Sequence, residues 1–288
     1  MITVIGDLVV DIIVKKGKTN YGTDTKGMIH FKPGGQANNV AAYISREGIE
    51  CTLIGKVGND PFGEFLIQKS IKSGVQPKIS KVDQDKTGSI IVMINENNGE
   101  RSMISDRGAN LTLNDKDIPN DLEADLIYLS GYSFFDENTR TAAFKAKNQA
   151  QMMEKMIALD PSSIFFLKEH KKEFLSFMRG ITFFFPNYEE GVLLTSQSEP
   201  FEIIKKLKSI VKYPILTLGD QGCIYWDGKS IKHIPALKVE AIDTTGAGDS
   251  FVAGFLAAYQ KKQDINQSIK HAIELSSTVV TSIGAHSF

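Results

Sequence analysis

Apolar runs alternate with amphipathic stretches along most of the chain. Short runs rich in apolar and β-branched residues predict buried strands, and they lie at residues 2–6, 51–58, 124–131, 156–161, 181–187 and 214–219. Apolar residues at helical spacing predict a helix that ends before Gly48, followed by helices at residues 61–73, 137–155, 168–178 and 200–211. From residue 124 onward strands and helices alternate, which is typical of βαβ units. We therefore expect an α/β fold with a central, mainly parallel sheet flanked by helices.

A second group of predicted strands has no helices between its members. Residues 12–33 contain two short strand patterns around a polar loop, and residues 88–106 have the pattern of a hairpin. The connection of this hairpin contains Asn98-Gly99, a pair that is favoured in tight turns. These segments predict a small antiparallel sheet that lies apart from the main one.

The last part of the chain predicts a hairpin followed by two helices. The hairpin has its turn at Asp227-Gly228, and the helices cover residues 247–261 and 266–282. Asn266 is the expected N-cap of the second helix, and Gly284 its expected end. Because no linker or low-complexity segment divides the sequence, we expect one domain over residues 1–288.

The charge balance argues against nucleic acid as a partner. The chain has 33 Lys and Arg against 34 Asp and Glu, whereas binding to a phosphate backbone requires a basic face. It has no run of about 18 apolar residues, so we expect no membrane span, and the N-terminus lacks the features of a signal peptide. Cys51 and Cys223 stand in apolar surroundings without metal-binding spacing. They predict buried thiols and a reducing, cytoplasmic location.

The segment from Asp243 to Asp249, DTTGAGD, carries the strongest chemical signal. Gly246, Ala247 and Gly248 form a turn of small residues that opens a helix, where backbone N–H groups converge and the helix adds positive potential. Such a turn can stabilise the charge that develops on a transferred phosphoryl group. A carboxylate in this position is not an anion ligand, so Asp249 suits a base that accepts the proton of an attacking hydroxyl. The alternative is an acidic residue at a helix start.

Two glycines precede the first predicted helix. Gly34 and Gly35 would allow the backbone to approach a ligand closely. Asn39 would lie on the first turn of this helix, within reach of ligand hydroxyls. The alternative is a turn followed by an asparagine that caps the helix.

Two further segments follow predicted core strands, at the sheet edge where ligands of open α/β folds bind. Asn187 and Glu190 could hold Mg²⁺ through water, although acidic residues are also common at helix starts. Thr217, Gly219 and Gly222 form a turn that could pass close to nucleotide phosphates.

Other nucleotide-binding and hydrolase motifs are absent. The segment from Gly222 to Ser230 has one residue too many between its glycines for a Walker A loop. The dinucleotide fingerprint fails because position 251 is Phe. The five histidines show no metal spacing, and no Gly-x-Ser-x-Gly elbow is present.

Over essentially its whole length the sequence resembles the ribokinase-like (PfkB-type) carbohydrate kinases. Two signature regions carry the resemblance: GGQANNVAAYISREGIECTLIGKVGNDPFG from Gly34 and DTTGAGDSFVAGF from Asp243. Between them stand the shorter matches RGAN, LSGY, LDP, PNYEE and TLGDQG. The resemblance implies a ribokinase-like fold whose small β-sheet is a lid over the substrate. It also implies transfer of the γ-phosphate of ATP, with Mg²⁺, to a hydroxyl of a small carbohydrate.

The resemblance also implies a role for each residue singled out. Asp249 becomes the catalytic base, and the turn before it becomes the anion hole for the γ-phosphate. Asp243 and Thr245 match residues that help to bind K⁺ in several relatives. The remaining positions divide into sugar contacts (Asp11, Gly34, Gly35 and Asn39), the element that organises Mg²⁺ and phosphate (Asn187 and Glu190), and nucleotide contacts (Thr217, Gly219 and Gly222).

The resemblance leaves the acceptor open. Ribokinase proper has a sugar-binding glutamate where this chain has Ser130-Gly131-Tyr132, which weakens the case for ribose. Arg107 in the lid segment would suit an acidic or phosphorylated sugar if it reaches the pocket. Fructose and ribose are the leading acceptors, with nucleosides and 2-keto-3-deoxy sugar acids as alternatives. A non-catalytic sugar or nucleotide sensor is the alternative of another class, and relatives suggest a homodimer formed through the lids.

Overall fold

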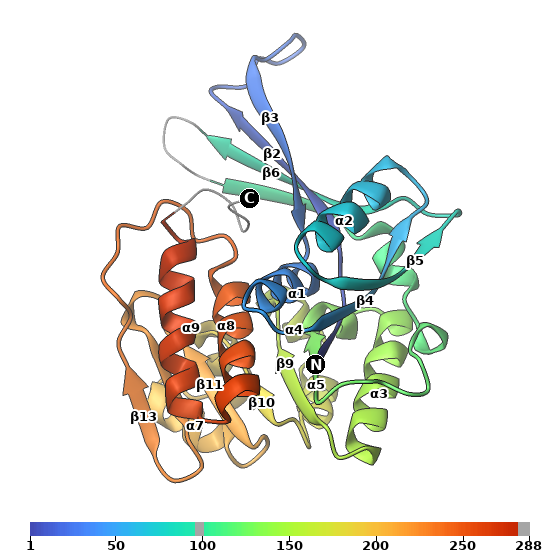
Figure 1. Cartoon of the computed structure of the whole chain (residues 1–288). Coiled ribbons are helices and arrows are strands. Elements are labelled where there is room, and N and C mark those ends of the chain that lie inside the picture. Colours follow the sequence, from blue (N-terminus) through green and yellow to red (C-terminus); the bar gives the residue numbers. More distant parts are fainter. Residues whose placement is uncertain (96–100, 282–288) are drawn as a thin grey trace.

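The computed structural model describes residues 1–95 and 101–281, which form two sheets and the helices around them (Figure 1). The strands are β1 (Ile2–Ile5), β2 (Val9–Lys16), β3 (Gly27–Gly34), β4 (Cys51–Gly58), β5 (Gln76–Val82), β6 (Gly88–Asn95), β7 (Arg101–Asp106), β8 (Leu126–Ser130), β9 (Met156–Asp160), β10 (Phe183–Phe184), β11 (Tyr213–Thr217), β12 (Cys223–Trp226) and β13 (Ile231–Ile234). The α-helices are α1 (Gln36–Arg46), α2 (Pro61–Lys72), α3 (Glu137–Met152), α4 (Ile164–Glu169), α5 (Lys171–Phe177), α6 (Tyr188–Thr195), α7 (Pro200–Leu207), α8 (Ala247–Lys262) and α9 (Ile265–Val279).

A nine-stranded sheet with the order β13-β12-β11-β10-β9-β8-β1-β4-β5 forms the centre of the described structure. Its pairs from β11 to β5 are parallel, and only the β11-β12-β13 edge is antiparallel. The expected α/β fold is therefore confirmed. Strand β5 was not predicted, because its residues alternate between exposed and half-buried positions without an apolar run.

The strands send alternate side chains into two helix layers, as β-structure requires. Val4 and Tyr128 belong to a core shared with α1, α2, α8 and α9. Ile5 and Leu129 belong to a core shared with α3 to α7. Both cysteines are free and fully buried, as predicted. Burial raises the pKa of Cys51 and of Cys223 to about 12, so both thiols stay protonated.

A second, four-stranded sheet has the order β3-β2-β6-β7 and projects from one end of the molecule (Figure 1). The prediction of an antiparallel sheet is wrong for its central pair, because β2 and β6 are parallel. The long connection between these two strands, which contains α1, β4, α2 and β5, allows this arrangement. The predicted Asn98-Gly99 turn lies outside the described residues.

Several element boundaries differ from those predicted. The segment 168–178 forms two short helices, α4 and α5, that meet at His170. The N-cap of α9 is Asp264 rather than Asn266, because the Asp264 carboxylate accepts the N–H of Gln267 at 2.8 Å. The Asn266 side chain instead accepts a hydrogen bond from the hydroxyl of Tyr225. Gly284, the predicted end of this helix, lies outside the described residues. No helix within residues 1–95 and 101–281 is long and apolar enough to cross a membrane.

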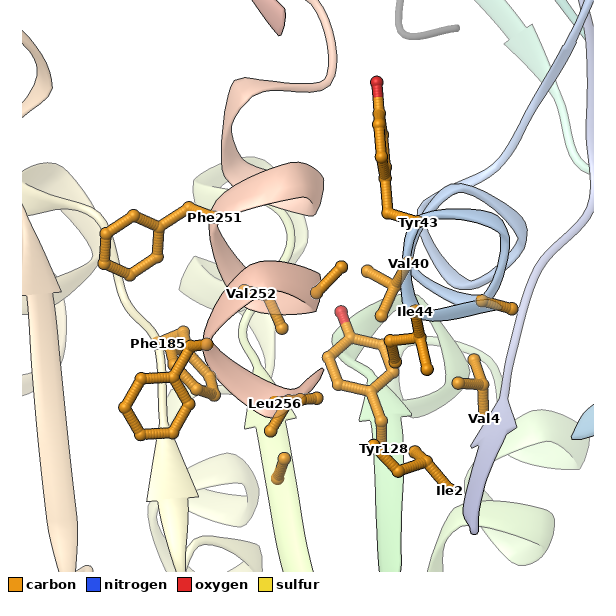
Figure 2. Close-up of a cluster of buried hydrophobic side chains, with 14 of the residues drawn as sticks. Ile2, Val4, Val40, Tyr43, Ile44, Tyr128, Phe185, Phe251, Val252 and Leu256 are labelled. Atoms are coloured by element: carbon orange, nitrogen blue, oxygen red, sulfur yellow. The ribbon is translucent and has the colours of Figure 1, made fainter. Parts of the chain in front are cut away.

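The packing of α1 against α8 brings two helix starts together. Figure 2 shows Val40 and Ile44 of α1 facing Val252 of α8, above Tyr128 of β8. All four side chains are at most 2% exposed. This buried contact fixes the first turn of α1 beside the first turn of α8, although the two helices are far apart in the sequence.

Candidate active site

Asp249 lies in the first turn of α8, directly after the predicted glycine turn. Gly246 is the N-cap residue with a φ of 79°, a backbone conformation that favours glycine. The Asp249 carboxylate accepts a hydrogen bond of 2.7 Å from the side-chain amide of Asn39. The structure therefore brings together Asp249 and Asn39, which the sequence analysis had selected separately.

The environment of Asp249 favours its protonated form. Burial raises the pKa of its carboxyl to about 8, the hydrogen bond from Asn39 lowers it, and the charges of Asp160, Asp7 and Asp11 raise it further. A carboxylate with a pKa in this range accepts protons far better than an ordinary aspartate. The arrangement suits a general base that works near neutral pH.

The start of α8 can also receive an anion. The first N–H groups of an α-helix have no acceptors within the helix. The N–H of Ala247 donates to the carbonyl of Thr244 at 3.2 Å, whereas that of Gly248, next to Asp249 in the chain, has no acceptor among the described residues. A Cβ atom at Gly248 would meet nothing within 4 Å. Packing among the described residues therefore does not require glycine at position 248. Space for a ligand is a reason for glycine at this position.

Two buried carboxylates face the same region. Asp160 at the end of β9 is 9% exposed and Glu190 in α6 is 3% exposed. Burial and the charge of Asp160 raise the pKa of Glu190 to about 8, and burial raises that of Asp160 to about 6. Together with Asp249 they line a cavity of about 200 Å³. A cation in this cavity would offset the cost of holding both carboxylates charged.

Asn187 and Glu190 also form a helix start, which was the alternative to a Mg²⁺ site for these two residues. Asn187 Oδ1 accepts the N–H of Glu190, and Glu190 Oε2 accepts the N–H of Asn187, each at 2.9 Å. This reciprocal capping box stabilises the first turn of α6. It also orients Glu190 towards the cavity that contains Asp249.

A larger cavity of about 570 Å³ adjoins the first one at the start of α8, and the two share Thr217, Gly248 and Phe251 in their linings. Thr217, Gly219 and Gly222 line it, together with Ala247 and Gly248. The apolar part of its lining consists of Ala236, Leu237, Val239, Ala241, Phe251, Ile273 and Val280. Such a cavity suits a nucleotide whose flat, largely apolar base lies in the cavity while its phosphates point to the helix N-terminus.

Asp243 and Thr245 lie just before the glycine turn. Asp243 is 7% exposed, and its Oδ1 accepts both the N–H of Thr245 at 2.9 Å and the Thr245 hydroxyl at 2.7 Å. Neither residue is among those that line the two cavities beside α8. In the part of the chain that the structure describes, no group of three or more His, Cys, Asp or Glu is arranged to hold a metal.

Asp11 and Gly34 lie against each other in the small sheet. A Cβ atom at Gly34 would collide with the Asp11 carboxylate, and Gly35 follows with a φ of 97°. Burial and the charge of Asp7 raise the pKa of Asp11 to about 7, whereas Arg107 opposes this shift. Gly34 thus makes room for a half-buried carboxylate at the base of the small sheet.

Arg107 has a partner within the chain. Its Nη1 donates to Asp7 at 2.9 Å, and its guanidinium lies 3.7 Å from the centroid of the Tyr132 ring. Asp7 follows β1, is 5% exposed and also accepts the N–H of Ala37 and the hydroxyl of Ser130. The charge of Arg107 is therefore already balanced by a buried carboxylate.

Four residues of this region were not selected from the sequence as site residues. Asp7 directly follows the predicted strand 2–6, and Asp160 and Ser162 lie at the end of the predicted strand 156–161, so the strand-end rule could have identified all three. Gln36 gave no such signal. Gln36 Oε1 accepts the hydroxyls of Ser130 and Ser162, which ties the start of α1 to the ends of β8 and β9.

A family model described as pfkB family carbohydrate kinase matches residues 1–288. The chain belongs to this family. As a pfkB-family carbohydrate kinase, it is a phosphotransferase with an alcohol as acceptor. It is 29% identical over 264 residues to the fructosamine kinase FrlD of Bacillus subtilis, covering 90% of this chain and 87% of that protein.

Two further pfkB-family comparisons cover nearly the whole chain. The ribokinase of Lactococcus lactis is 28% identical over 302 residues, which cover 99% of this chain and 92% of that protein. A crystal structure named as a candidate ribokinase II of E. coli, in complex with ATP and Mg²⁺, superposes with a TM-score of 0.90 at 25% identity. It covers 99% of this chain and 94% of its own, which confirms the ribokinase-like fold.

Proposed function

We propose that this pfkB-family kinase transfers the γ-phosphate of ATP to a hydroxyl of a small carbohydrate, with Asp249 as the base. One observation carries the proposal. Asp249, with its pKa raised to about 8, lines the cavity that holds two buried carboxylates and accepts a hydrogen bond from Asn39, and it directly follows Ala247 and Gly248, which line the large cavity.

The proposed reaction divides the site into two sides. On the donor side, Thr217, Gly219 and Gly222 contact the nucleotide in the 570 Å³ cavity. The N–H groups of the turn from Gly246 to Gly248 then stabilise the γ-phosphate as its charge redistributes. Each of these contacts acts through backbone or small side chains, which leaves space for the triphosphate.

On the acceptor side, Asp249 takes the proton of the attacking hydroxyl as the oxygen bonds to phosphorus. Asp11, Asn39 and the backbone at Gly34 and Gly35 bind the other hydroxyls of the sugar. The small sheet, which carries Asp11, acts as a lid that closes over the acceptor and excludes water. Water excluded in this way cannot compete with the sugar for the phosphoryl group.

The residues around Glu190 fit Mg²⁺. Asp160 and Glu190 are two carboxylates held together under burial, and Mg²⁺ binds through a few carboxylates while keeping several waters and substrate phosphates as ligands. When bound, Mg²⁺ would neutralise charge on the phosphates. The E. coli structure solved with ATP and Mg²⁺ supports this assignment by fold similarity. We also propose K⁺ near Asp243 and Thr245, on the resemblance alone.

Fructose, ribose or a related sugar is the proposed acceptor, in line with relatives named for fructosamine and ribose. The ion pair between Arg107 and Asp7 disfavours a sugar acid, because its carboxylate would have to compete with Asp7 for the guanidinium. Because the charge of Arg107 is balanced by Asp7, nucleosides are better supported than sugar acids as the alternative class of acceptor. A non-catalytic sensor would have no use for the raised pKa of Asp249.

We further propose a cytoplasmic homodimer formed through the small sheets. Its strands expose large apolar side chains that are each more than half exposed: Met28, Ile29, Phe31, Met103 and Ile104. Exposed apolar surface of this kind is costly in water and typical of interfaces. Size-exclusion chromatography with light scattering decides between a monomer and a dimer.

An ADP-release screen tests the proposed function. Purified protein with MgATP is incubated with fructose, ribose, 2-keto-3-deoxygluconate and nucleosides, and mass spectrometry identifies any phosphorylated product. We expect acceptor-dependent ADP release with one phosphate added to a sugar. If every acceptor leaves ADP release at the background rate, the proposed acceptor class is wrong.

A further inference from the structure

A third cavity, of about 230 Å³, lies on the acceptor side of the site. Gly6 and Asp7 after β1 line it, together with residues of two 3₁₀ turns, η1 (Gly108–Thr112) and η3 (Gly131–Phe134), and of the start of α3. Strands β1 and β8 are neighbours in the large sheet. The next strand of this sheet after β1 is β4, on one side of the pair, and the next after β8 is β9, on the other side. The cavity therefore lies at the topological switch point, where ligands of open α/β sheets bind.

Aromatic side chains form much of the wall of this cavity. Tyr132, Phe135 and Phe166 line it, and the rings of Phe135 and Phe166 stack with centroids 5.1 Å apart. Leu111 and Leu113 add further apolar surface. An apolar cavity of about 150 Å³ is sufficient to hold benzene, so this one has room for a single ring and its link. Stacking on aromatic side chains favours a flat ring.

The polar side chains of the wall are mostly occupied by partners within the chain. Asn110 exchanges two hydrogen bonds with the backbone of Leu8, at 2.9 and 2.7 Å. Asp136 caps α3 by accepting the N–H of Asn138 at 2.9 Å. A second sugar ring would need several free polar partners to replace water, and these two side chains do not provide them.

Arg107 gives the cavity its one distinctive polar feature. Its Nη1 is paired with Asp7, but its buried Nε–H has no hydrogen-bond partner among the described residues. A buried donor of this kind costs free energy until an acceptor reaches it. Because this N–H lies beneath the accessible surface, an acceptor atom on a bound molecule satisfies it only if the Arg107 side chain shifts on binding. A charged group is disfavoured, because a cation would meet the guanidinium and an anion would compete with Asp7.

Arg107 also connects this cavity to the acceptor site. It lines the cavity, and its charge acts on Asp11, the sugar contact proposed above. We infer that the cavity binds a neutral, planar substituent that carries a hydrogen-bond acceptor and is attached to the sugar that the enzyme phosphorylates. This inference rests on the proposed function, and it makes the preferred acceptor a substituted sugar rather than a free one.

Matched pairs of acceptors test the inference. Uridine is compared with ribose, and 1-benzamido-1-deoxy-D-fructose with fructose, because each pair differs by a neutral planar group that contains a carbonyl. We expect the substituted member of at least one pair to have a kcat/KM at least tenfold higher. Phenyl β-D-ribofuranoside, which has a ring without a carbonyl, should fall between ribose and uridine. Equal or higher kcat/KM for both free sugars overturns the inference while leaving the proposed function intact.

Three variants locate the preference in the cavity. Phe166→Ala removes a wall and Leu111→Trp fills the space, so each should reduce the ratio of substituted to free kcat/KM at least fivefold. Phe165→Ala is the matched control, because Phe165 neighbours Phe166 in α4 but is 66% exposed and is not among the lining residues. A ratio that Phe165→Ala changes as much as Phe166→Ala contradicts the assignment.

A binding measurement covers the case in which no acceptor turns over, which would refute the proposed acceptor class. Titration calorimetry with the two matched pairs, uridine and ribose, and 1-benzamido-1-deoxy-D-fructose and fructose, in the presence of MgADP, then tests the inference separately. We expect the substituted compound of one pair to bind at least tenfold more tightly than its free sugar, and this difference should be lost in Leu111→Trp. Weaker or equal binding of both substituted compounds overturns the inference.

Discussion

The two sides of the site that meet at Asp249 are built from different kinds of residue. Around the large cavity, the donor side uses glycines, backbone groups and apolar side chains from residues 217–280, and the buried carboxylates of Asp160 and Glu190 lie beside it. The acceptor side uses charged and aromatic side chains from the first half of the chain, such as Asp11, Arg107 and Tyr132. The proposed donor is ATP, which backbone groups and the shape of the cavity are sufficient to bind. The acceptor side must instead distinguish among similar alcohols, which requires particular side chains.

Asp249 serves both sides, so its substitution should have the largest effect. Asp249→Asn keeps the shape of the side chain but cannot accept a proton. We expect kcat to fall by about 10³-fold, within the range for loss of a general base, because the acceptor hydroxyl keeps its proton. Single-turnover kinetics measure this loss, and calorimetry with ATP should show that the nucleotide still binds. A variant that turns over within tenfold of wild type would remove Asp249 as the base.

Gly248 tests the donor side alone. A Cβ atom there meets nothing within 4 Å, so Gly248→Ala should fold normally. The added methyl group would nevertheless stand where the terminal phosphate approaches the helix start. We expect kcat/KM for ATP to fall about 100-fold, the lower end of the range for the loss of an oxyanion-hole donor. The matched control is Gly17→Ala, where a Cβ atom also meets nothing within 4 Å. Equal activity of the two variants would exclude Gly248 from the phosphate site.

Gly34 provides the corresponding test on the acceptor side. A methyl group at position 34 would displace the carboxylate of Asp11. We therefore expect Gly34→Ala to raise KM for the acceptor about tenfold, the effect of a lost hydrogen bond to a charged group. The affinity for ATP should be unchanged, as measured by calorimetry. A variant that loses ATP affinity and acceptor affinity equally would show that the two sides are not independent.

The same contrast explains what the sequence could predict. The strand and helix pattern was sufficient for the α/β fold, because the apolar strands of the parallel sheet are buried on both faces. The glycine turn and the helix start before Asp249 were also predictable, because they are contiguous in the sequence. Part of the acceptor side was missed because it depends on contacts between distant segments. Asp7 meets Arg107 one hundred positions later, and neither residue alone indicates an ion pair.

Substitution of Glu190 should have the smallest effect, and this effect is on stability rather than on catalysis. Its pKa is raised from 4.5 to about 8, so between these values the native state binds a proton that the unfolded chain has released. The contribution of Glu190 to the free energy of unfolding therefore falls as pH rises from about 4.5 to about 8, and then levels off. Glu190→Gln removes this contribution, leaves those of the other buried carboxyls, and can still accept the N–H of Asn187.

We therefore expect Glu190→Gln to have a higher Tm than wild type at pH 8, by at least about 2 °C for a gain near 1 kcal/mol. The difference should shrink towards pH 5, and calorimetry at several pH values in chelator measures it. Adding Mg²⁺ with ATP should then reverse the order, because the cation stabilises only the carboxylate form. If Mg²⁺ and ATP stabilise both proteins equally, Glu190 has only its role in the helix cap, and the donor side needs another explanation for its buried charge.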